Sequence, residues 1–506
     1  MFDAPPPNEL ELSELHVVSD LHLGGAAPGS QIFKEGTRLA ALIRGLRRRP
    51  TESLALVLNG DIVDFLAEEG ASVFDPAGAI GKLWRIINDP SFSDVWAALR
   101  ELVAGGGAGV ARTLVFVLGN HDIELALPHV RQWLSNWLAA GDDGARGRIL
   151  WATEGAGFTA LVGGRRVLCL HGNEVDDWNL VDHLALLQTA RAYHRGMPAP
   201  TWRSNAGSSL VVDVMNPIKR AYPFVDLLKP EVEAAVPLLF ALKPSLVKSI
   251  GRAAALVGRK WIDGLRASAG FLGEGASEAV EVKAEDSGEA RVRELVLQLS
   301  GTALPLTGLQ ARMEAVQLRI ERGEQAPASD EEASRFLGGD GAVFGIANPM
   351  ELLRSALKRA LPDDRSFEVS AADDTFRSLD AQVGSHVHFL IAGHTHLRRA
   401  LPRQGEGCFY YNTGTWIRLI RLSPAALADK QAFERLFRVL GSPSLLELDA
   451  HRNEDGTPFV HTEPTVASIV GSARGTYGVL NGVQPDGSLE SIEGTRFPRE
   501  VSLGQL

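Results

Sequence analysis

The chain has 506 residues, of which 45% are hydrophobic and 22% charged, and its formal net charge is −11. This composition is that of an ordinary folded protein with two or three folding units, and it excludes wholesale disorder and fibrous repeats. The acidic balance gives no general attraction for a polyanion, because nonspecific nucleic-acid affinity depends on lysine and arginine, so a nucleic-acid partner is not expected.

Cysteine usage and hydropathy predict where the protein resides. The two cysteines, Cys169 and Cys408, stand far apart in apolar runs and form no disulfide framework, which favours a reducing cytoplasm. Residues 1–10 lack the basic start and apolar block of a signal peptide. The most apolar stretch, Ala234 to Leu242, ends at Lys243 and is too short to span a bilayer.

Short β-branched and leucine-rich runs recur along the chain, each bounded by glycine or polar residues. They predict six strands, at 15–19, 54–58, 113–118, 166–170, 387–392 and 408–413. Helical patterns at 37–49 and 92–103 separate the early strands. The alternation of strand and helix predicts an α/β fold with a layered sheet and buried strands.

A polar cluster follows each of the first five predicted strands. The clusters are V-S-D-L-H-L-G (18–24), L-N-G-D-I-V-D (58–64), L-G-N-H-D (118–122), L-H-G-N (170–173) and A-G-H-T-H (392–396). In open α/β sheets, ligands bind outside the carboxyl ends of strands, so we expect these five loops to converge on one site.

Between His171 and His394 the regular succession of predicted strands is interrupted, and the hydrophobic pattern is mainly helical. We therefore predict a core at 13–180 and 380–447, a helical insert or cap at 181–379, and a β-rich C-terminal extension at 448–506, where N-G and D-G turns recur. Within the insert, Lys248, Arg252, Arg259 and Arg266 share one helix face. This basic stripe is either a solvated outer face or a contact with anionic lipid at a membrane surface or with a phosphorylated substrate.

The five clusters together offer oxygen and imidazole donors and no thiolate. Their candidate ligands are Asp20, His22, Asp61, Asn120, His171, His394 and His396. Such donors suit Mn, Fe, Zn or Co rather than a closed structural zinc site. Seven ligands are too many for a single ion. They suit two divalent ions that share one carboxylate, activate a water molecule and bind the oxygens of a phosphoryl group.

The ordered set D-x-H, G-D-x-x-D, G-N-H-D, H-G and G-H-x-H resembles the calcineurin-like metallophosphoesterase family over residues 13–180 and 380–420. The resemblance implies a layered β-sandwich flanked by helices. It also implies one metal on Asp20, His22 and His396, a second on Asn120, His171 and His394, and Asp61 as the bridge, with manganese preferred.

The resemblance also implies roles beside the metals. His121 would stabilise the phosphoryl oxygens and protonate the leaving oxygen, and Asp64 would orient its imidazole. Alternatively, Asp64 only caps a helix amino terminus. We expect Asp122 to hydrogen bond a ligand or the loop.

The predicted activity is hydrolysis of a phosphate monoester, diester or pyrophosphate by metal-activated hydroxide. Within the family, D-L-H-L at 20–23 is similar to the UDP-2,3-diacylglucosamine hydrolases, which cleave a lipid-linked pyrophosphate, and D-x-H-x-G also resembles repair-type exonucleases. For a nucleic acid the best local patch is Arg44, Arg47, Arg48 and Arg49, which a solvated helix end also explains. The non-enzymatic alternative is a catalytically inactive protein that binds metal and serves as a scaffold.

Overall fold

The computed structural model describes a large part of the chain outside the central insert. The described residues are 9–25, 31–68, 72–105, 110–176, 179–198, 200, 202, 205, 208, 224, 227–229, 354, 367–421, 427–440, 445–452, 456–473 and 475–498. The chain divides into two compact units. The larger comprises Met1–Ser208, Arg365–Arg418 and His461–Leu506, and the smaller comprises Ser209–Asp364 and Leu419–Val460.

A seven-stranded sheet forms one layer of the larger unit, in the order β16-β15-β14-β2-β3-β4-β5. Its parallel strands are β2 (Glu14–Val18), β3 (Ser53–Asn59), β4 (Ala111–Val117) and β5 (Ile149–Ala152). Its antiparallel strands are β14 (Thr465–Ser472), β15 (Gly475–Val483) and β16 (Leu489–Ser491). The first three predicted strands are confirmed as β2, β3 and β4.

A six-stranded sheet forms the second layer, in the order β1-β6-β7-β9-β11-β10. Its strands are β1 (Leu10–Leu12), β6 (Phe158–Val162), β7 (Arg165–Cys169), β9 (Phe389–Ala392), β10 (Arg398–Pro402) and β11 (Phe409–Thr413). The pairings of β7 with β9 and of β9 with β11 are parallel. The other three predicted strands are confirmed as β7, β9 and β11.

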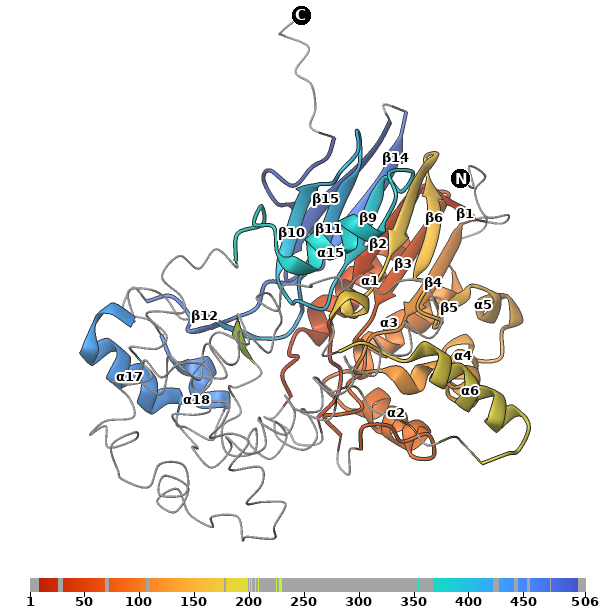
Figure 1. Ribbon diagram of the computed structural model, residues 1–506, viewed down its shortest axis with the longest axis horizontal. Helices are drawn as coiled ribbons and strands as arrows, with labels where there is room; N and C mark the ends of the chain where they lie inside the picture. The colour runs from red at the N-terminus through yellow and green to blue at the C-terminus, as the bar shows by residue number, and fades with distance from the viewer. Residues whose placement is uncertain are drawn as a thin grey trace, which may run out of the picture. The chain divides into compact units, whose positions relative to one another are not determined.

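The apolar core lies between the two sheets. Val17, Val57 and Val115 of the seven-stranded sheet belong to the same buried cluster as Val167 and Ile391 of the six-stranded sheet. Alternate residues of a strand point to opposite faces, so every second side chain of these strands enters this core. The strands of the two layers overlap in the view of Figure 1, and the predicted α/β class with layered sheets is confirmed.

Helices flank the two sheets. They are α1 (Gly36–Arg48), α2 (Ala79–Asn88), α3 (Ser93–Ala104), α4 (Pro128–Ala139), α5 (Asp143–Gly147), α6 (His183–His194) and α15 (Asp374–Gln382), with short 3-10 turns η1 (Ile123–Ala126) and η2 (Asn173–Val175). The predicted helices at 37–49 and 92–103 are confirmed as α1 and α3. Helix α3 contacts β4, and α5 contacts β5 (Figure 1). None of the helices in the described ranges has the length and hydropathy that a bilayer crossing requires.

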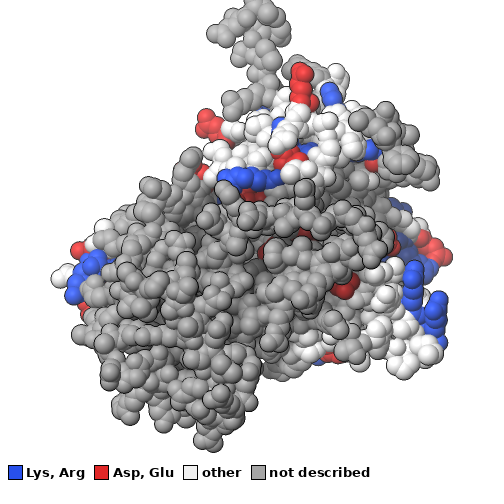
Figure 2. All heavy atoms as spheres, in the orientation of Figure 1, with Lys and Arg blue, Asp and Glu red and all other residues white. Residues whose placement is uncertain are grey.

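Two arginines near the end of α1 make ion pairs within the protein. Arg44 donates to Asp94 and Glu101, and Arg49 forms an ion pair with Glu14. Over the described surface seen in Figure 2, basic and acidic side chains are intermixed. These pairings favour the structural interpretation of the arginine cluster over a nucleic-acid patch.

The smaller unit contains a three-stranded sheet in the order β13-β12-β8 and two helices. The strands are β8 (Leu228–Lys229), β12 (Leu419–Arg421) and β13 (Val460–His461), and the helices are α17 (Lys430–Leu440) and α18 (Leu445–Ala450). The predicted basic stripe from Lys248 to Arg266 lies outside the described residues, as does most of the predicted insert.

The region expected as a C-terminal extension contributes to the main sheet. Ile469 of β14 pairs with Leu15 of β2, and β15 and β16 follow outward. Strand β14 therefore lies directly beside the strand that leads into the first polar cluster.

Candidate metal centre

The five polar clusters meet where the two sheets end. Strands β2, β3 and β4 are neighbours in one sheet, and β7 and β9 are neighbours in the other. Each leads directly into one cluster at its carboxyl end. Backbone hydrogen bonds join adjacent loops: Asp20 N donates to Gly60 O at 3.1 Å, and Gly393 N donates to His171 O at 2.7 Å. The predicted convergence is therefore present.

The first group of candidate ligands is Asp20, His22 and His396, whose ligand atoms lie within 4.8 Å of one another. Asp20 Oδ1 lies 3.3 Å from His396 Nε2, which lies 3.2 Å from His22 Nε2. His22 Nδ1 lies 3.2 Å from the Asp64 carboxylate. When Nδ1 donates to Asp64, Nε2 presents a lone pair toward the group, as a metal ligand requires.

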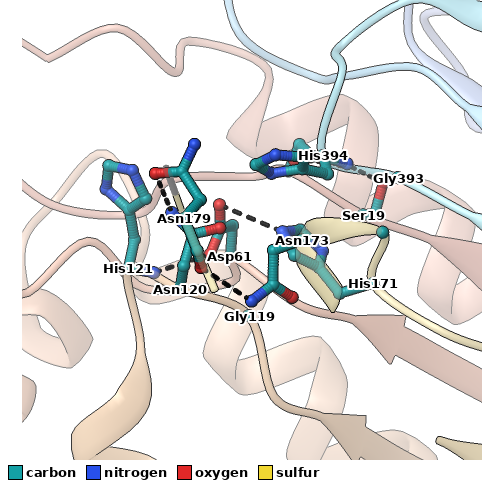
Figure 3. A network of polar contacts seen from close by, with 12 residues as sticks. Ser19, Asp61, Gly119, Asn120, His121, His171, Asn173, Asn179, Gly393 and His394 are labelled. Atoms are coloured by element: carbon teal, nitrogen blue, oxygen red, sulfur yellow. Dashed lines mark hydrogen bonds and ion pairs between the residues drawn. The ribbon is translucent and has the colours of Figure 1, made fainter. Parts of the chain in front are cut away.

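The second group is Asp61, His171 and His394, with ligand atoms again within 4.8 Å of one another. His171 is fully buried, and its Nδ1 donates to Asn59 O at 2.9 Å. In the neutral imidazole that metal binding requires, its Nε2 would then carry the lone pair, and this nitrogen lies 3.3 Å from Asp61 Oδ2. Asn120 lies beside the group, as Figure 3 shows.

Asp61 lies between the two groups. Its Oδ2 is 3.3 Å from His171 Nε2 of the second group and 3.8 Å from His22 Nε2 of the first. Its Oδ1 accepts the backbone N–H of His121 at 2.8 Å, which fixes the carboxylate (Figure 3). This is the position that a carboxylate shared by two cations needs.

His121 and Asp64 stand beside the two groups. His121 Nδ1 lies 3.2 Å from Asp64 Oδ1, and the His121 side chain is 16% exposed. Asp64 also accepts the backbone N–H groups of Leu66 and Ala67, both at 3.0 Å. Asp64 therefore accepts backbone N–H groups, as a capping residue would, and also makes the predicted contact with His121.

Buried carboxylates give the centre a strong negative field. Burial opposes ionisation of Asp61, but the neighbouring His171 and His121 hold the pKa of its carboxyl well below the usual range. Burial would lower the pKa of His171, but the charge of Asp61 raises it to about 10. The site therefore favours positive charge at its centre.

Asp122 holds the loops rather than facing the ligands. Its two oxygens accept the backbone N–H groups of Gly119 at 2.7 Å and Ile62 at 2.8 Å, which confirms the predicted contact with the loop. Burial and the charge of Asp61 raise the pKa of Asp122 to about 7.

The backbone is strained where the candidate ligands lie. Six non-glycine residues in the described ranges have positive φ, and five of them are predicted ligands: Asp20 (53°), His22 (47°), Asp61 (52°), His394 (69°) and His396 (62°). The left-handed region costs a non-glycine residue about 1–3 kcal/mol and persists where the surroundings enforce it, which marks functional sites.

Some contributors to the centre were not predicted from the sequence. Asn412 of β11 donates to Gly393 O at 2.6 Å and accepts Gly414 N–H at 2.9 Å, so it fixes the G-H-T-H loop. Asp176 Oδ2 lies 2.8 Å from His394 Nε2, and Asn179 faces Asn120. The only sequence signal for Asp176 and Asn179 was their nearness to His171.

The donor set fits metal ions. Asn120 Oδ1 is buried and has no hydrogen-bond partner among the described residues, although buried polar atoms are normally satisfied. His171 Nε2 is also buried and makes no hydrogen bond there, although it lies 3.3 Å from Asp61 Oδ2. A divalent cation bound by these atoms would satisfy both. The His and Asp groups can therefore hold metal.

The family comparison agrees with this geometry. Residues 14–227 match the model of the calcineurin-like phosphoesterases. This part of the chain is a calcineurin-like phosphoesterase domain. The matched residues include the first four clusters, and the structure adds the fifth, which contains His394 and His396, from beyond the match. No curated protein matched the chain.

Proposed function

We propose that this phosphoesterase hydrolyses phosphate esters with two divalent ions, manganese being preferred over iron, zinc and cobalt. Asp20, His22 and His396 would hold the first ion, and Asn120, His171 and His394 the second. The position of Asp61 Oδ2 between His22 and His171 is the observation that carries the proposal.

When bound, such a pair of cations neutralises the phosphoryl oxygens and supplies hydroxide near neutral pH. The chain's own residues perform the remaining steps. Asp64 orients the His121 imidazole through Nδ1, which leaves Nε2 to contact the phosphoryl group. From there His121 protonates the leaving oxygen.

The test is turnover of bis-p-nitrophenyl phosphate and p-nitrophenyl phosphate by Mn²⁺-loaded protein, with metal content measured in parallel. We expect about two ions per chain and turnover of at least one substrate, and comparison of the two separates diesterase from monoesterase activity. Bound metal without turnover of either substrate would favour the scaffold alternative. Absence of bound metal would refute the proposal.

A second, narrower candidate is a phosphate ester that carries an apolar group, such as a lipid-linked pyrophosphate. An exposed leucine face begins beside the centre: Leu180 is 51% exposed, Leu184 64% and Leu187 39%. Leu180 follows Asn179, which faces Asn120, and α6 contacts η1, just after His121. This leucine face supports the same kind of partner, anionic lipid, that the basic stripe suggested.

The leucine face can be tested with Leu184→Glu and Leu187→Glu. We expect both variants to retain turnover of the p-nitrophenyl substrates but to lose turnover of an acylated pyrophosphate presented in micelles. Leu446→Glu is the matched control, because Leu446 of α18 is also 64% exposed. Equal losses in Leu446→Glu, or no loss in the α6 variants, would refute the apolar substrate. Exonuclease-like action is tested by adding single-stranded DNA to the same assay.

The two cysteines are buried and free, which supports the proposed cytoplasmic location.

A further inference from the structure

Two side chains outside the family motif connect ligands of the second group. Asp176 Oδ2 lies 2.8 Å from His394 Nε2 and accepts from Asn179 Nδ2, also at 2.8 Å. The Asn179 amide oxygen accepts from Asn120 Nδ2 at 3.5 Å, the upper limit for a hydrogen bond. The chain of contacts therefore runs from His394 through Asp176 and Asn179 to Asn120.

The loop between η2 and α6 holds these two residues in place. Asn173 Nδ2 donates to the backbone oxygen of Asn179 at 3.0 Å, and Asn179 N donates to Asp176 O at 3.0 Å. Figure 3 shows Asn179 directly above Asn120 and beside His121. The Asp176 side chain is 30% exposed, so its carboxylate does not serve as core packing.

The contacts determine which atoms of the two ligands remain for a cation. A carboxylate can only accept, so His394 donates from Nε2, and its lone pair is then on Nδ1. Asn120 donates from Nδ2, so its Oδ1 is the oxygen that lies buried with no hydrogen-bond partner in the described part of the chain. His394 Nδ1 and Asn120 Oδ1 are thereby left with lone pairs that face no hydrogen-bond donor in these contacts, and a metal ligand requires such a lone pair.

We propose that Asp176 and Asn179 are positioning residues that select the ligating atoms of His394 and Asn120 and thereby set the affinity of the second metal position. The inference rests on the proposed two-metal function. The first position depends on Asp20, His22 and His396, whereas Asp176 and Asn179 contact His394 and Asn120, which belong to the second position. The two positions should therefore respond differently to changes in this loop.

The test is a Mn²⁺ titration of metal-free protein, followed by calorimetry and by electron paramagnetic resonance, which distinguishes one bound Mn²⁺ from a coupled pair. We expect Asp176→Ala and Asn179→Ala to weaken the second binding step about 10- to 100-fold and to leave the first unchanged. Asp176→Asn should weaken it less, because its amide oxygen still accepts from His394.

Asp182→Asn is the matched control. Asp182 lies in the same segment, but its carboxylate caps α6 by accepting Ala185 N–H at 2.9 Å. We expect both of its binding steps to match wild type. The proposal is overturned if Asp176→Ala leaves both steps unchanged, weakens both equally, or behaves as Asp182→Asn does.

Failure of this inference can be separated from failure of the proposed function. If wild-type protein binds two ions and turns over substrate while the loop variants bind normally, only the positioning role is refuted. If wild-type protein never shows the coupled pair, the two-metal function itself is refuted. Where the positioning role holds, excess Mn²⁺ restores turnover in Asn179→Ala.

Discussion

One oxygen of the Asp64 carboxylate lies 3.2 Å from Nδ1 of His121. The other oxygen lies 3.2 Å from Nδ1 of His22, so one side chain faces both a candidate acid and a candidate metal ligand. Burial opposes its ionisation, but His121 and His22 keep the pKa of Asp64 far below normal, so it remains charged.

Asp64→Asn should lower turnover while keeping the fold. The amide retains one acceptor for the turn at Leu66 and Ala67, but it removes the charge that favours a proton-donating imidazole. We expect a loss of roughly 10- to 1000-fold in kcat, within the range of general acid catalysis. Binding of the second metal should stay near wild type, and binding of the first, whose ligand His22 contacts Asp64, should fall less than turnover does. If binding of the first metal fell as much as turnover, the main role of Asp64 would instead be to position the metal ligand His22.

Asp61→Ala and His121→Ala should separate metal binding from chemistry. Removal of Asp61 eliminates the carboxylate between the two groups, so both metal content and turnover should fall. Removal of the His121 ring should leave metal content unchanged and lower turnover at least about 100-fold. Atomic absorption and the diester assay measure the two quantities. Equal metal loss in both variants would contradict these roles.

Gly119→Ala should disrupt the centre although it adds only a methyl group. A Cβ at Gly119 would overlap both Asp61 Oδ1 and the Asp61 backbone nitrogen. We expect loss of metal binding and a destabilisation of about 1–3 kcal/mol, the usual cost of overpacking. Gly147→Ala is the control, since a Cβ there meets no atom within 4 Å. Normal metal content in Gly119→Ala would show that the loop shifts without consequence.

Glu124→Gln should reduce the fall in the free energy of unfolding that occurs as the pH rises from about 4.5 to 7. Glu124 is buried, and burial raises the pKa of its carboxyl to about 7 from a usual 4.5. The folded state thus binds an extra proton between these values, so stability falls as pH rises from about 4.5 through 7. The 2.5-unit difference corresponds to at most about 3 kcal/mol.

Thermal unfolding of metal-free protein at pH 5 and pH 8 measures this effect. The glutamine amide oxygen can still accept Asp75 N–H, which Glu124 Oε1 accepts at 2.9 Å. The Tm difference between the two pH values should therefore shrink in Glu124→Gln. It should persist in Glu52→Gln, a change at an exposed glutamate. An unchanged difference in Glu124→Gln would mean that another group titrates.

The strands and the candidate ligands could be predicted because their signals are local. An apolar run such as T-L-V-F-V followed by N-H-D indicates a buried strand that ends in a polar loop. The convergence of the loops follows from the parallel pairing of such strands. Seven scattered residues could therefore be expected at one edge of the sheets.

The unpredicted features depend on contacts between distant residues. Nothing in T-V-A-S-I-V-G-S shows that β14 pairs with β2, because a strand pattern does not specify its neighbour. Asp176 is 218 residues from His394, and acidic and amide residues are common in any turn. The roles of Asp176 and Asn179 become apparent only once Asn120 and His394 are placed beside them.

The pairing of Leu15 with Ile469 has a consequence during synthesis of the chain. At about 5–20 residues per second, β2 is complete roughly 20 to 90 seconds before its neighbour β14 is synthesised. Until then β2 is an open sheet edge, which can pair with other chains. Newly made protein should therefore aggregate most readily when translation stops after His396 but before β14, although all seven candidate ligands have by then been synthesised.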